Sequence, residues 1–203
     1  MEGSQEAAFN LNQLAIVLSR TERFDEAVAT YRRALEVTEG LAADPSEDSL
    51  AVQQRLNVLR ANMAVVQYRK GDLQDAAESF EQVLAVVQQE LPPTHPYIGT
   101  LHNNLANAYQ RLGRRTATRV HAENAVEIDR AARGARHPAV ADSLLKLGQA
   151  LQLLGDYDAA EALFVESRGI LVEHRGEENF QVAQRDYELG MLRMRRGEST
   201  RAL

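Results

Sequence analysis

Hydrophobic residues recur along this chain at steps of three and four, the spacing that places them on one face of an α-helix. One such segment carries Leu101, Leu105, Ala108, Tyr109 and Leu112. Gly113 interrupts it, and the same spacing resumes between residues 117 and 132. A short glycine turn between two helical segments predicts two antiparallel helices that pack side by side. The apolar-polar alternation of strands is absent over useful lengths, so we predict an all-α fold.

The helix pair is repeated along the chain. Steps of 42 residues from Leu105 lead to Leu147 and Leu189, and one step back leads to Met63. A further step back needs 49 residues, to Leu14. A period of this size indicates a solenoid, in which each unit packs only on its neighbours. We predict one solenoid domain over residues 1–203, with repeats at about 8–41, 50–91, 96–133, 138–175 and an incomplete 180–203.

Proline, glycine and register predict the helix boundaries within the repeats. We predict second helices at residues 25–39, 74–89, 116–131 and 158–173. His95-Pro96 and His137-Pro138 place proline at the first helical position, where its missing N–H costs nothing. The seven additional residues before the second repeat predict a longer first helix there, because Val52, Leu56 and Leu59 keep one face. A loop at residues 42–49 is the alternative.

Certain residue types return at fixed positions of the pair. The third repeat contains His102-Asn103-Asn104-Leu105-Ala106, Tyr109 and Gly113, and the fourth contains Leu147-Gly148, Gly155, Tyr157, Ala160 and Phe164. These positions resemble tetratricopeptide repeats (TPR) of the 42-residue type found in kinesin light chains. The resemblance implies an α-α superhelix, a right-handed α-solenoid of about four and a half antiparallel helix pairs.

Composition narrows the range of functions. The formal net charge is −6 and the pI is near 5.4, which argues against nucleic acid and anionic membranes as partners. The sequence has no cysteine, no phosphate-binding glycine loop and no histidine or carboxylate group at metal-ligand spacing. We therefore expect no catalytic residue, metal site, cofactor or enzyme activity. The N-terminal residues lack a secretory signal and no segment has the apolar length of a membrane span, which favours a cytoplasmic protein.

Polar residues of the first helix in the third repeat lie away from its packed stripe. At 100° per residue they fall about 80° to 180° from that stripe. They are Thr100, Asn103, Asn107, Gln110 and Arg111. Such side chains donate and accept hydrogen bonds, as the backbone of an extended peptide requires. We predict that they line a concave peptide-binding groove, and the resemblance to kinesin light chains implies that Asn103 does so.

The other repeats offer corresponding candidates for the groove. They are Asn12 in the first repeat, Tyr68 and Arg69 in the second, Leu145 and Gln149 in the fourth, and Tyr187 in the fifth. Four apolar side chains are expected to be exposed on this face, namely Leu145, Leu153, Tyr187 and Met191. They either anchor a ligand or are covered by another segment.

Four arginines, Arg20, Arg69, Arg111 and Arg195, share one register position. In one interpretation they bind acidic groups of a ligand. In the other they complement the helix dipole, because they lie in the last turn of each first helix.

Two repeats depart from the common pattern. In the third, Arg115, Thr118 and Ala122 stand where tyrosine, alanine and an aromatic recur elsewhere, which predicts a weak joint in the middle of the array. The fifth has a first helix and no second one, so we expect Leu192 and Met194 to be exposed. Either this helix caps the array or the chain is a piece of a longer protein.

These observations predict a protein–protein interaction scaffold that binds a peptide or protein segment in its concave groove. Two alternatives stay open. One is a regulatory or sensor segment of a larger bacterial signalling protein, such as a kinase or ATPase. The other is an assembly module that self-associates through the incomplete C-terminal repeat.

Overall fold

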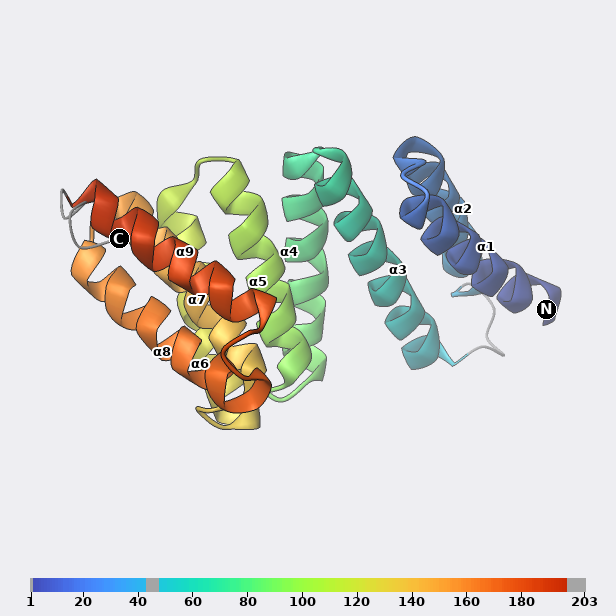
Figure 1. Cartoon of the computed structure of the whole chain (residues 1–203). Coiled ribbons are helices and arrows are strands. Elements are labelled where there is room, and N and C mark those ends of the chain that lie inside the picture. Colours follow the sequence, from blue (N-terminus) through green and yellow to red (C-terminus); the bar gives the residue numbers. More distant parts are fainter. Residues whose placement is uncertain (1, 43–47, 197–203) are drawn as a thin grey trace. The chain divides into compact units, whose positions relative to one another are not determined.

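The computed structural model describes residues 2–42 and 48–196. These residues form nine α-helices and no strand, grouped in two compact units, Met1–Gln89 and Glu90–Leu203 (Figure 1). The first unit contains α1 (Glu2–Arg20), α2 (Phe24–Leu41), α3 (Ser49–Lys70) and α4 (Leu73–Glu90). The second contains α5 (Pro96–Arg111), α6 (Arg115–Arg133), α7 (Pro138–Leu154), α8 (Tyr157–Arg175) and α9 (Phe180–Arg195). The all-α fold of antiparallel helix pairs is confirmed.

Each predicted second helix is present and extends slightly beyond its predicted bounds. Helices α2, α4, α6 and α8 begin one residue earlier than expected and end one or two residues later. Turns of two or three residues separate them from the first helices α1, α3, α5 and α7. The continuity of both units in one solenoid domain stays a prediction.

The histidine–proline pairs begin two first helices, as predicted. His95 is the N-cap of α5, and its Nδ1 accepts a hydrogen bond from the backbone N–H of Tyr97 at 3.2 Å. His137 caps α7 in the same way, through the N–H of Ala139 at 3.1 Å. Each imidazole satisfies one helix-terminal N–H and the adjoining proline has none, so both helices begin at fixed residues.

Helix α3 has 22 residues, whereas α5 has 16 and α7 has 17. The longer first helix expected in the second repeat is therefore confirmed; residues 43–47 of the alternative loop lie outside the described residues. The additional turns of α3 are packed, because Val52 and Leu56 form a buried cluster with Leu41 of α2. This packing explains why an insertion lengthens a helix.

Aromatic residues of the second helices occupy the core of the pairs. Tyr31, Phe80 and Phe164 are buried. In the fourth repeat the two helices approach so closely that a Cβ on Gly148 would lie 2.5 Å from Cε1 of Phe164. A larger residue at position 148 would have to displace the ring, so this crossing depends on glycine.

The third repeat has a different core. Buried Ala122 takes the aromatic position, and His102 of α5 meets His121 of α6 with their Nδ1 atoms 2.9 Å apart. The ring of His121 also stacks on Tyr109, with ring centroids 5.4 Å apart. Burial, and to a smaller extent the neighbouring His121, lower the pKa of His102 to about 4. The histidine contact was not foreseen from sequence spacing, and the weak joint at this repeat stays a prediction.

Leu192 is buried, so its expected exposure was wrong. Leu189 and Leu192 of α9 pack on Ala160 and Phe164 of α8 in one cluster. This stripe of α9 is covered by the preceding helix, whereas Met194, on another side of α9, is exposed as expected.

Candidate binding surface

In the second unit, the predicted groove residue Asn103 bonds to neighbouring helices. Its Nδ2 donates to Oγ of Ser143 on α7 at 2.7 Å and to Oδ2 of Asp129 on α6 at 3.5 Å. Ser143 in turn donates to Asp129 at 2.6 Å, and Asp129 is buried. Asn103 therefore joins three helices, which is a structural role that the sequence did not indicate.

The next two predicted residues along this face also pair between first helices. Asn107 accepts a hydrogen bond from Nζ of Lys146 at 2.7 Å, and Gln149 donates to Glu188 of α9 at 2.7 Å. The pKa of Lys146 is lowered because its ammonium group is buried, although the nearby carboxylate of Asp142 partly opposes this shift. The expected row of polar groups thus exists across α5, α7 and α9, and much of its hydrogen-bonding capacity is used within the chain.

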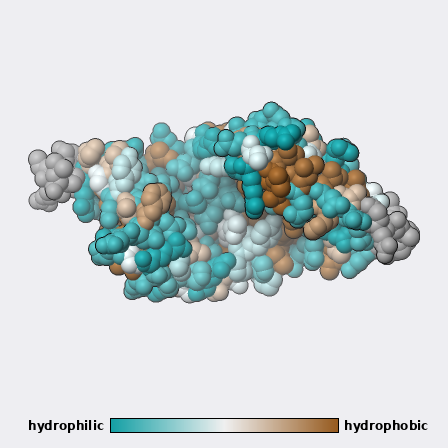
Figure 2. All heavy atoms as spheres, turned by 45° about the vertical axis from the view of Figure 1, so that its right-hand side comes forward, coloured by the Kyte–Doolittle hydropathy of each residue, from teal (hydrophilic) through white to brown (hydrophobic). Residues whose placement is uncertain are grey.

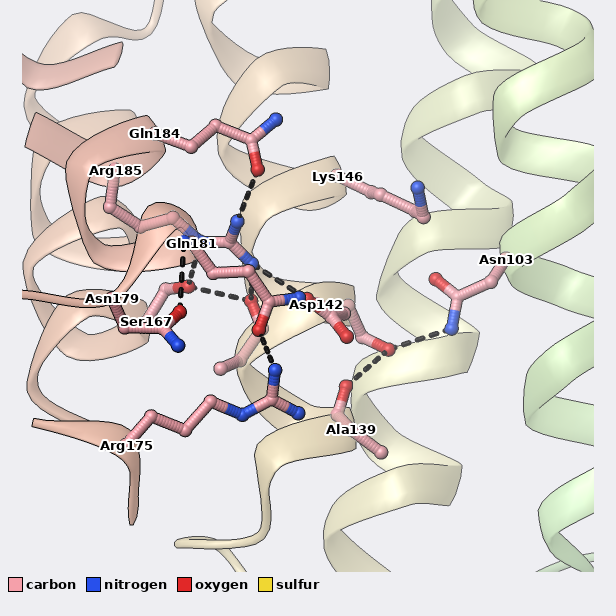
Figure 3. Close-up of polar contacts among 12 residues, drawn as sticks. Asn103, Ala139, Asp142, Lys146, Ser167, Arg175, Asn179, Gln181, Gln184 and Arg185 are labelled. Atoms are coloured by element: carbon pink, nitrogen blue, oxygen red, sulfur yellow. Dashed lines mark hydrogen bonds and ion pairs between the residues drawn. The ribbon is translucent and has the colours of Figure 1, made fainter. Parts of the chain in front are cut away.

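Arg185 of α9 is the largest polar feature that the sequence interpretation missed. Its side chain is 1% exposed and reaches from α9 towards α7 and α8 (Figure 3). The guanidinium donates to Oδ1 of Asp142 at 2.7 Å, to Oγ of Ser167 at 3.0 Å and to Gln184 at 2.8 Å. Steps of 42 residues relate Arg185 to Ser143 and Leu101, so an arginine at a core register position was the available signal.

In the first unit, two predicted groove residues link α1 and α3. Asn12 accepts a hydrogen bond from Asn62 at 3.4 Å. Arg69 donates to Oγ of Ser19 at 2.9 Å and lies 5.1 Å over the ring of Phe24. Arg69 is therefore used within the unit, although Arg20, Arg69, Arg111 and Arg195 all lie in last helical turns, as the dipole interpretation requires.

The first unit also contains a cavity of about 600 Å³ between α1 and α3, and Thr38 of α2 contributes to its lining. Its lining consists of Gln5, Glu6, Ala8, Phe9, Asn12, Thr38, Ala51, Gln54, Arg55, Val58 and Leu59. Phe9 is 62% exposed and Val58 is also exposed, so two large apolar side chains face solvent there. Figure 2 shows a large hydrophobic area, in brown, in the right half of the visible face, with smaller brown areas elsewhere.

The remaining predicted residues differ in exposure. Leu145 is buried with Leu189 and Leu192, so its expected exposure was wrong: α9 covers it. Tyr187 is exposed, as expected for a ligand-facing side chain. Tyr68 and Gln110 are half-buried and Arg111 is exposed, and Leu153 and Met191 are half-buried. Binding by any of these residues stays a prediction.

Groups suited to metal binding are scarce. Within the described part of the chain, no cluster of three or more His, Cys, Asp or Glu side chains could hold a metal ion. His102, which is buried, and His121, which is half-buried, form a pair through their Nδ1 atoms. Two imidazole rings can share one hydrogen bond when one nitrogen donates and the other accepts, which fits a packing role.

These helix pairs, with capped first helices and aromatic residues packed in each pair, define a helical-repeat protein. Family models described as tetratricopeptide repeat match residues 11–44, 54–117 and 97–171. The chain belongs to the tetratricopeptide repeat family. A comparison with curated proteins finds no match.

Solved structures share this fold. A putative kinesin light chain from Podosopora anserina is 22% identical with a TM-score of 0.80, covering 100% of this chain and 92% of its own. YrrB, described as a TPR protein with an unusual peptide-binding site, is 19% identical with a TM-score of 0.61 and coverage of 100% and 84%. A Rap protein complexed with Competence and Sporulation Factor is 19% identical with a TM-score of 0.70 and coverage of 97% and 51%.

No helix among the described residues has the length and apolar character needed to cross a membrane.

Proposed function

We propose that the chain is a protein-interaction scaffold without enzyme activity, which binds a peptide or protein segment on the face of its first helices. The observation that carries this proposal is the cavity of the first unit. It combines exposed apolar side chains, Phe9 and Val58, with the amides of Asn12 and Gln54. Apolar side chains anchor a bound segment, and amides pair with its backbone.

The size of the cavity supports this function. A volume of about 600 Å³ lies within the usual range of ligand sites and is large enough for apolar side chains of a bound segment. Solitary exposed apolar residues are common, but two of them beside a cavity are typical of an interaction site.

Two structural relatives support a peptide ligand. YrrB is described as having an unusual peptide-binding site, and the Rap protein is complexed with Competence and Sporulation Factor. Their identity to this chain is 19% in both cases, so they support the kind of ligand and leave its sequence open.

In the second unit, the polar face provides the weaker part of the proposed surface. The side chains of Asn103 and Asn107 are bonded to Ser143 and Lys146, whereas the side chain of Gln110 makes no hydrogen bond among the described residues. We expect Gln110, with the exposed Arg111 one position later, to contact a ligand before the two asparagines do.

The experiment is selection of binders from a random peptide library displayed on phage, followed by affinity measurements on variants. We expect the double variant Phe9→Asp and Val58→Asp to bind a selected peptide at least tenfold more weakly, because it places charges on the apolar wall. Val120→Asp is the matched control, since Val120 is an exposed valine on α6. Equal affinities of the wild type and the double variant would reject the cavity as the binding site.

Self-association is a second candidate, favoured by one observation. Tyr187 and Met194 of α9 are exposed and lie two helical turns apart on one side of the helix. An apolar pair of this kind can pack on another copy. We expect light scattering to show a concentration-dependent mass that Tyr187→Glu abolishes; a constant monomer mass would contradict this candidate.

A further inference from the structure

One stripe of α1 differs from the matching stripe of every later first helix. It consists of Ala7, Asn10, Leu14 and Val17 and is called the outer stripe here. A step of 49 residues relates it to α3, and steps of 42 residues relate α3 to α5, α7 and α9. For Val17, the matching residues are Val66, Ala108, Ala150 and Leu192.

The residues matching Val17 are buried in the four later helices; of those matching Leu14, Leu105 and Leu189 are buried, and Met63 and Leu147 are half-buried. Val66, Ala108, Ala150 and Leu192 have at most 2% of their surface exposed. In α1, by contrast, Leu14 is 50% and Val17 is 56% exposed. The outer stripe thus carries apolar residues like those of a helix interface, but no helix among the described residues covers them.

The chain itself shows which element covers such a stripe. Val66 of α3 packs in a cluster with Ala34 of α2. Val140 of α7 packs in a cluster with Val126 of α6, and Leu192 of α9 packs on Phe164 of α8. In all three cases the cover is an amphipathic second helix, so the same kind of helix fits α1.

A polar residue within the stripe indicates a further property of the covering helix. Asn10 matches Ser143 of α7 and Arg185 of α9. Ser143 donates to Asp129 of the covering α6, and Arg185 donates to Ser167 of the covering α8. By the same pattern, a helix on the outer stripe carries a polar side chain that pairs with Asn10.

We propose that the outer stripe binds an amphipathic α-helix of a partner protein. The apolar side chains of the bound helix lie on Leu14 and Val17, and one of its polar side chains forms a hydrogen bond with Asn10. This surface is separate from the cavity, whose lining includes none of these three residues. The proposal therefore does not depend on peptide binding at the cavity.

The test uses a synthetic peptide of the α6 sequence, Arg115–Arg133, as a probe, because it carries both Val126 and Asp129. The full chain, labelled at its methyl groups, is titrated with this peptide and followed by NMR. We expect saturable shifts of the Leu14 and Val17 methyl signals and at least tenfold weaker binding in the double variant Leu14→Glu and Val17→Glu. Leu50→Glu with Val165→Glu is the matched control, since Leu50 is 55% and Val165 is 52% exposed.

A residue swap tests the polar contact. The variant Asn10→Leu is expected to bind the Asp129→Leu peptide more tightly than the unchanged peptide, because Leu59 and Leu101 occupy the matching position in α3 and α5. Absence of shifts at Leu14 and Val17, or equal binding by the Leu14→Glu and Val17→Glu variant, would overturn the proposal. So would a dimer of the free chain that this double variant makes monomeric, because a second copy would then be the occupant.

Discussion

The face formed by the first helices differs between the two units. In the first unit, Phe9 and Val58 are exposed beside a cavity, and α1 and α3 share the 3.4 Å contact of Asn12 with Asn62 and the contact of Arg69 with Ser19. In the second unit, the amide of Asn103 bonds at 2.7 Å to the next first helix. Polar groups therefore pair between first helices in both units. The first unit differs because two large apolar side chains, Phe9 and Val58, are also exposed on this face.

The largest expected effect is the loss of Arg185 in the second unit. Arg185→Met removes a buried guanidinium and leaves Asp142 and Ser167 without their donor. The Asp142 carboxylate is 49% exposed and is solvated after the substitution, so the expected cost of about 2 to 3 kcal/mol in unfolding free energy comes from the lost hydrogen bonds of the buried guanidinium. Arg69→Met in the first unit is the control, and its cost is expected near 1 kcal/mol because Arg69 is exposed. Urea denaturation measures both, and equal losses would contradict the difference between units.

The next effect is pH dependence in the third repeat. Because the pKa of His102 is about 4 in the folded chain and ordinarily 6.5, the unfolded chain binds a proton first as the pH falls. Stability is therefore complete above pH 6.5 and is lost between pH 6.5 and 4, by about 3 kcal/mol. Chemical denaturation at several pH values measures this loss.

The control for that pH dependence is His102→Leu, which takes the residue found at the matching position 144. We expect it to flatten the profile between pH 6.5 and 4. A wild-type profile that is already flat in this interval would contradict the assignment to His102.

A smaller effect concerns α6 compared with α4 of the first unit. Helix α4 has Phe80 in its core, whereas α6 has Ala122 at the same position. A missing aromatic leaves fewer apolar contacts, so we expect backbone amides of residues 115–126 to exchange about tenfold faster than those of residues 73–84. Hydrogen exchange followed by mass spectrometry measures the difference. Equal protection would show that the His102–His121 contact replaces the aromatic fully.

The smallest effects compare two asparagines at one register position. Asn103→Ala removes the donor to Ser143 and Asp129, which costs about 1 to 2 kcal/mol. Asn12→Ala removes only the long contact with Asn62 and is expected to cost about 0.5 kcal/mol or less. Thermal unfolding of both variants gives the comparison, and a greater loss for Asn12→Ala would contradict it.

Helix boundaries and pair cores could be predicted because they depend on neighbouring residues in the sequence. Proline after His95, glycine at 113 and the step between Leu105 and Tyr109 act within one or two turns. The burial of Leu145 could not be predicted in this way, since it depends on Leu189 and Leu192 more than 40 residues later. The position of a residue within the repeat shows which side of the helix it lies on, but does not show which residues of other repeats it contacts.

The candidate surface was predicted only in part for the same reason. The sequence predicted the face on which Asn103 and Asn107 lie. It did not predict their partners Ser143 and Lys146, because these belong to the next repeat. The cavity of the first unit arises between α1 and the lengthened α3, and no residue type marks an empty volume in a sequence. Arg185 was the one visible signal, as a charged residue in an apolar register.

The close approach of Gly148 to Phe164 restricts how these repeats can be exchanged. Duplication and recombination of repeats require that any first helix fit any second helix. Because a Cβ at position 148 would lie 2.5 Å from the ring, Phe164 must shift before α8 can accept a first helix with a side chain there. A hybrid that places α5 against α8 would bring Ala106 to this point, and we expect it to need a compensating smaller residue at 164. We therefore expect the exchange of α7 or α8 alone to cost more stability than the exchange of both helices together.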